Sequence, residues 1–133
     1  MKICVKGLKE QKYSPKLFKD FLQYLQTELP ISKTVNIVLT SNKGGDMTTG
    51  VRLPNEMKVL ADGRLLVDVL RTLAHEWVHE YQHQKMGITE KDEVPDIGGP
   101  VENMASVLAS IFLKKFQKIF PQHCEELYQK KDK

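Results

Sequence analysis

Apolar residues recur at helical spacing in three stretches of the chain, at positions 15–29, 65–85 and 100–120. Ser14 stands just before the first stretch, where a serine side chain can cap a helix. Gly87 follows the second, in the position that glycine favours at a helix C-terminus. The pattern therefore predicts three amphipathic helices, and each of them needs a partner to bury its apolar face.

Three shorter stretches between the first two helices have the composition of strands. Val35–Leu39 is rich in β-branched residues, and Thr48–Leu53 and Glu56–Ala61 are weaker candidates separated by a turn. A short helix is also expected within Gln122–Lys133. Because a helix, then strands, then helices follow one another, we predict the α+β class. The length of 133 residues fits one domain covering residues 1–133.

The second predicted helix contains His75-Glu76-Trp77-Val78-His79. Residues four apart lie on one helix face, so the imidazoles of His75 and His79 can converge on one metal ion. Glu76, one step around the helix, is placed to act as a base on water activated by that metal. The spacing predicts a catalytic zinc site. The competing interpretation is an exposed helical face on which two histidines coincide.

A catalytic zinc needs a third protein ligand and an open position. His83 continues the spacing, but it is eight residues and about 12 Å of helical rise from His75. Glu80 points around the helix, away from His79. Glu102, in the first turn of the third helix, can reach the site if the two helices run antiparallel, and the small Ala105 would allow close approach. Alternatively, Glu102 only stabilises the start of its helix through the helix dipole.

The two His, the Glu between them and the Glu102-Asn103-x-Ala105-Ser106 segment together resemble the gluzincins, a group of thermolysin-like zinc metallopeptidases. The short length is similar to that of their minimal members, the minigluzincins, and the resemblance covers roughly residues 56–113. It implies a zincin-like domain in which His75, His79 and Glu102 bind Zn²⁺ and Glu76 is the general base. It also implies that the strand 56–61 is the sheet edge that binds an extended peptide substrate.

The sequence departs from the gluzincin pattern in two places. Many gluzincins have an aspartate four residues after the glutamate ligand, where it orients a ligand histidine, and this chain has Ser106 there. Gluzincins also often supply a Tyr or His that stabilises the oxyanion. His123 or Tyr128 could do this only if the C-terminal segment folds over the site. The departures leave open a second function, a non-catalytic or autoinhibited zinc-bearing domain that binds a peptide or protein partner.

Composition bears on which partners and which location we expect for the protein. The chain has 20 basic and 17 acidic residues, a net charge of +3, and no recognisable nucleic-acid-binding signature, so we expect no nucleic-acid partner. The resemblance to gluzincins implies a peptide or protein substrate. No apolar stretch is long enough for a membrane span, and the first residues do not resemble a signal peptide. We therefore expect a cytoplasmic protein, a monomer, in which Cys4 and Cys124 are reduced thiols.

Overall fold

A computed structural model describes residues 3–32, 34–41, 50–53, 55–87 and 100–128. These residues form four strands and five α-helices, which confirms the α+β class. In chain order the elements are β1 (Ile3–Lys6), α1 (Leu8–Gln11), α2 (Pro15–Glu28), β2 (Val35–Thr40), β3 (Gly50–Leu53), β4 (Glu56–Leu60), α3 (Leu66–Lys85), α4 (Pro100–Ile119), a single 3-10 turn (Pro121–His123) and α5 (Cys124–Leu127). The three long helices and strands β2 to β4 were predicted from the sequence. Strand β1 and helix α1 were not.

The strands form one mixed sheet in the order β1-β2-β4-β3. β1 and β4 run parallel to β2, whereas β3 pairs antiparallel with β4. The turn between β3 and β4 includes Asn55 in a left-handed conformation (φ 61°), which asparagine adopts more readily than most residues. The edge strands of this sheet are therefore β1 and β3, and β4 lies inside it.

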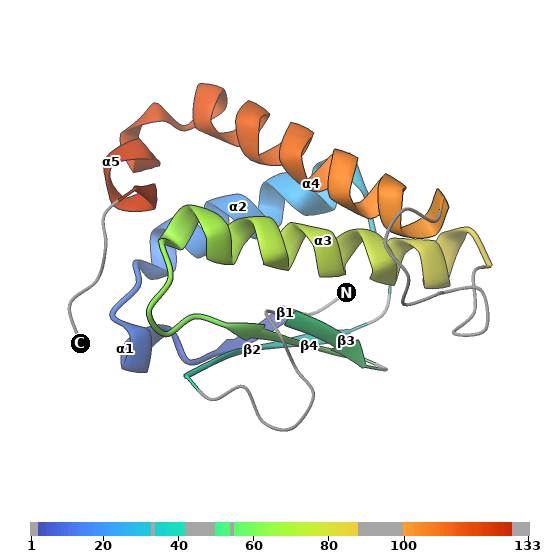
Figure 1. Ribbon diagram of the computed structural model, residues 1–133, viewed down its shortest axis with the longest axis horizontal. Helices are drawn as coiled ribbons and strands as arrows, with labels where there is room; N and C mark the ends of the chain where they lie inside the picture. Colours follow the sequence, from blue (N-terminus) through green and yellow to red (C-terminus); the bar gives the residue numbers. More distant parts are fainter. Residues whose placement is uncertain (1–2, 33, 42–49, 54, 88–99, 129–133) are drawn as a thin grey trace.

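All three long helices lie on one face of the sheet (Figure 1). α2 and α3 lie directly above the strands, and α4 runs along the outer side of α3, with which it makes the most extensive contact between any two elements. Alternate residues of β2, namely Val35, Ile37 and Leu39, are buried against these helices. Trp77 of α3 is also fully buried, and its indole N–H donates to the Leu29 carbonyl. The core thus holds α3, which carries the histidines, between the sheet and α4.

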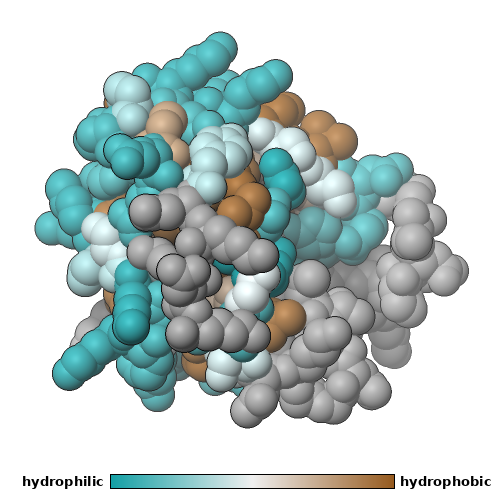
Figure 2. All heavy atoms as spheres, turned by 60° about the vertical axis from the view of Figure 1, so that its left-hand side comes forward, coloured by the Kyte–Doolittle hydropathy of each residue, from teal (hydrophilic) through white to brown (hydrophobic). Residues whose placement is uncertain are grey.

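The surface is predominantly polar at the end of the molecule that carries α1 and α5 (Figure 2). Among the described residues, no helix is both long and apolar enough to cross a membrane.

The C-terminal turn is fastened to α2 by a buried charged contact. His123 Nε2 lies 2.9 Å from Asp20 Oδ2, and Lys16 Nζ donates to Asp20 Oδ1 at 2.9 Å. The His123 ring also stacks on Phe116, with an interplanar angle of 8°. The hydrogen bonds from His123 and then Lys16 lower the pKa of Asp20. The ionised form of Asp20 is therefore more stable in the folded protein than in the unfolded chain.

We expect Asp20→Asn to lower the free energy of unfolding at pH 7 by about 2 kcal/mol, as for other hydrogen bonds to a charged group. A carboxyl group whose pKa falls on folding stabilises the protein above its unfolded pKa, about 3.9, and this stabilisation is lost as the pH falls through the lower folded value. The difference between Asp20→Asn and wild type in urea unfolding should therefore shrink below about pH 4. An equal difference at all pH values would contradict this explanation. Asp68→Asn, on the exposed side of α3, is the control.

Candidate metal centre

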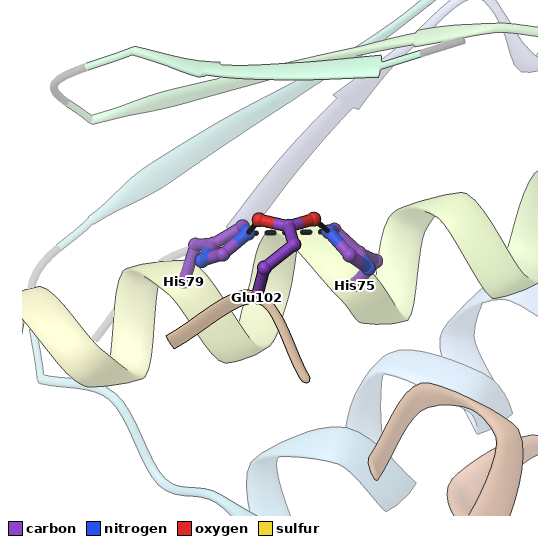
Figure 3. Close-up of side chains that lie close together, drawn as sticks. All are labelled: His75, His79 and Glu102. Carbon is purple, nitrogen blue, oxygen red and sulfur yellow. Dashed lines mark hydrogen bonds and ion pairs between the residues drawn. The ribbon is translucent and has the colours of Figure 1, made fainter. Parts of the chain in front are cut away.

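Three predicted ligands come together at the contact between α3 and α4. His75 and His79 lie on successive turns of α3, and both rings turn toward the Glu102 carboxylate of α4 (Figure 3). Glu102 Oε1 lies 2.5 Å from His75 Nε2, and Glu102 Oε2 lies 3.2 Å from His79 Nε2. The ligand atoms of the three residues all lie within 4.8 Å of one another, so this group could hold a metal ion.

The spacing of the two histidine donor atoms is compatible with one shared metal ion. The two Nε2 atoms are 3.2 Å apart. Ligands with bonds of 2.0–2.1 Å around a tetrahedral centre are separated by about 3.3 Å. Burial lowers the pKa of His75, and this effect is larger than the opposing effect of the Glu102 carboxylate. The neutral imidazole, which is the form that binds metals, is therefore favoured at neutral pH. The donors are therefore close enough together to share one ion, and His75 favours the protonation state that binds it.

Gln82 determines which nitrogen of His79 faces the cluster. The fully buried Gln82 side chain donates from Nε2 to the Val101 carbonyl at 3.0 Å, and its Oε1 lies 2.9 Å from His79 Nδ1. Because a carbonyl only accepts hydrogen bonds, the amide N–H₂ must face Val101, and Oε1 must accept from His79 Nδ1–H. The lone pair of neutral His79 is then on Nε2, which points into the cluster. Gln82 thus orients one candidate ligand and ties α3 to Val101, the residue before another candidate, Glu102.

Sequence reasoning missed the role of Gln82. Its position three residues after His79, on the same helix face, is the signal that could have suggested it. Ser106, the position at which the gluzincin pattern would supply an orienting aspartate, is exposed on α4.

Glu76 lies beside the first residue of the edge strand β3. A Cβ atom added to Gly50 would lie 2.5 Å from Thr72 Cγ2 and 3.6 Å from Glu76 Cγ. Only a residue without a side chain fits this close contact without displacing its neighbours. The expectation that the strand at 56–61 forms the sheet edge was wrong, since β4 pairs on both sides and β3 is the edge next to Glu76.

A buried ion pair connects β3 to α3 one turn beyond Glu76. Arg52 Nε donates to Glu80 Oε1 at 3.0 Å, and Gln84 Nε2 donates to the other carboxylate oxygen at 2.6 Å. The side chains of Arg52 and Glu80 are 10% and 3% exposed, so solvent screens their interaction only weakly. As predicted, Glu80 is not part of the metal cluster. It instead fixes the edge strand relative to the histidine helix.

The remaining candidates lie outside the cluster. His83 is half-buried on α3 and does not belong to the metal-binding group found among the described residues. The suggestion that His123 or Tyr128 reaches the site is wrong: His123 contacts Asp20, and the exposed Tyr128 donates to Gln117 Oε1 at 3.0 Å. Cys4 is a free, half-buried thiol on β1, and the second cysteine is also unpaired, as expected.

No family model matches the sequence, and neither a curated protein nor a solved structure matches it.

Proposed function

We propose that this protein is a zinc-dependent peptidase of the gluzincin type, with a zincin-like fold. The observation that carries the proposal is the convergence of His75, His79 and Glu102 on one point of the α3–α4 contact, with Glu76 adjacent to one of them in sequence. Two imidazoles and one carboxylate are a donor set typical of catalytic zinc, in which the fourth position stays open for water or substrate.

Each residue then has a separate role. His75, His79 and Glu102 would hold the zinc, and Gln82 would keep the His79 ring in its binding orientation. When bound, zinc supplies Lewis acidity, which activates water near neutral pH and polarises a peptide carbonyl. Glu76 accepts the proton of the attacking water and later donates a proton to the leaving amine. A purely structural site would have no need of Glu76.

The edge strand β3 is the proposed place for the substrate backbone. Its outer side is not paired with any described strand, and Gly50 lies against the helical turn that carries Glu76. An extended peptide that pairs with β3 would be held by main-chain hydrogen bonds close to the proposed base. Because the Arg52–Glu80 ion pair fixes β3 on α3, the peptide would be positioned relative to the metal ligands as well.

The test is to measure metal content and peptide cleavage together. Purified protein should contain one zinc per chain by mass spectrometry and should cleave casein, and a chelator should abolish cleavage until zinc is restored. Protein that binds no zinc, even after zinc is added back, would refute the proposal.

A second function remains a candidate because of one observation. The two residues proposed as oxyanion donors, His123 and Tyr128, have partners elsewhere in the structure. A zinc-bearing domain that binds a peptide without cleaving it would need no such donor. Stoichiometric zinc and saturable peptide binding without cleavage would favour this alternative.

We expect Gln82→Met to weaken zinc binding by roughly 10- to 100-fold, the range typical of residues that orient a metal ligand. Methionine has a similar size, but its side chain can neither accept from His79 Nδ1 nor donate to the Val101 carbonyl. Competition with a chromophoric chelator measures the affinity. Gln122→Met, at an exposed position, is the matched control. Unchanged affinity in a folded Gln82→Met protein would show that Gln82 does not position His79.

A further inference from the structure

An apolar groove opens at the sheet edge opposite β3. It has a volume of about 390 Å³ and lies between β1 and α2, with Ile3 and Val5 on one side and Phe18 and Leu22 on the other. Lys19 of α2 also lines it. Because β1 and β3 are the two outer strands of the sheet, this groove is separate from the metal centre and from the proposed peptide-binding edge.

The strand register explains why the groove is apolar. Ile3 pairs with Val35, and Val5 pairs with Ile37, so all four side chains lie on the face of the sheet that the helices cover. Val35 and Ile37 are fully buried, whereas Ile3 and Val5 are only half-buried. The apolar layer between sheet and helices therefore continues up to β1 and is open at that edge.

The main chain at this edge favours one kind of occupant. No described strand pairs with the outer side of β1, so within the described part of the chain the outward-pointing N–H and C=O groups of residues 3–6 are open to pairing. An added strand would satisfy these groups and would place every second side chain over the groove. A compact small molecule could fill the groove but could not pair with the strand.

The charge around the groove restricts the occupant further. Lys19 is the one charged residue among those that line the groove. Lys6, the exposed last residue of β1, alternates with Ile3 and Val5 and therefore lies on the opposite face of the sheet. A second copy of the chain at this edge would bring like charges together, whereas a segment with acidic residues would be attracted.

We propose that the groove between β1 and α2 binds an extended segment of a partner protein, in which apolar and acidic residues alternate, by adding it to β1 as a strand. The apolar side chains of the segment cover the groove, and its acidic side chains, on the other face of the sheet, lie beside Lys6 of β1. The proposal does not depend on metal binding or peptidase activity.

The test uses a fluorescently labelled peptide of about seven residues in which valine alternates with glutamate, a length that matches an ordinary strand. Binding to the full chain is measured by fluorescence anisotropy. We expect saturable binding that a peptide of valine and lysine does not reproduce. Methylation of alternate peptide nitrogens on the edge-pairing side should weaken binding at least about tenfold, since it removes the main-chain donors.

Matched variants and hydrogen exchange locate the site. Lys6→Glu, on the face of β1 that meets the acidic side chains, should weaken binding about fivefold, whereas Lys115→Glu, an exposed lysine on α4, should not. The peptide should slow amide exchange in Ile3–Lys6. Slowed exchange in Gly50–Leu53 instead, or equal binding of the methylated peptide, would overturn the proposal. Absence of binding would overturn the proposal as well. So would a dimer in sedimentation experiments that the peptide does not dissociate, because a second copy of the chain would then occupy the edge.

Discussion

Glu76→Gln is expected to reduce peptide cleavage by about 10³-fold, within the range of general base catalysis, while one zinc per chain remains bound. Glutamine has nearly the same shape as glutamate, but its amide cannot accept the proton of the attacking water. The neighbouring His75 keeps its contact with Glu102, so the metal ligands are unchanged. The effect should fall on kcat, because the lost interaction belongs to the transition state and not to substrate binding.

The measurement is the kinetics of casein cleavage together with metal content and a thermal unfolding curve for the same preparation. Glu56→Gln, on the internal strand β4, is a control of identical chemistry outside the metal cluster. If Glu76→Gln retained zinc and full activity, Glu76 would not be the base and the proposed mechanism would be wrong. If wild type bound zinc and cleaved nothing, the binding-domain function would replace the peptidase.

Glu102→Ala is expected to weaken zinc binding by more than the roughly 10- to 100-fold typical of residues that only orient a ligand. The substitution removes the single donor that comes from α4 and leaves His75 and His79 as a two-ligand site. The fold should survive, because Glu102 lies in the first turn of α4 and is not part of the core. Loss of activity should follow the loss of metal and should be partly restored at high zinc concentration.

Affinity is measured by chelator competition, with Glu125→Ala of α5 as the control for removal of a glutamate. Glu102→Asp is a second useful variant, since it keeps the carboxylate but shortens its reach, and it should bind zinc between wild type and Glu102→Ala. Wild-type affinity in Glu102→Ala would mean that Glu102 only stabilises the start of its helix, the alternative that the sequence left open.

The local pattern of the sequence determined the long helices and the histidine pair. Apolar spacing and Ser14, which caps α2 by accepting from the Leu17 N–H, are properties of neighbouring residues, so they can be read without tertiary contacts. His75 and His79 face the same way because they are four residues apart on one helix. Glu102 was predicted from its place at the start of the next helix, and the antiparallel contact of α3 with α4 brings it to the histidines.

The features that only the tertiary structure decided are contacts between residues far apart in the chain. Strand β1 has only four residues, and it is a strand because it pairs with β2, across the whole of α2. The order of the strands made β3 the edge beside Glu76 and β4 an internal strand, which no pattern within either strand encodes. Gln82 became the residue that orients His79 only because Val101 of α4 accepts from its amide. The sequence left open whether His123 or Tyr128 reaches the site. Their partners, Asp20 and Gln117, are set by how the chain end packs, and local periodicity carries no information about that packing.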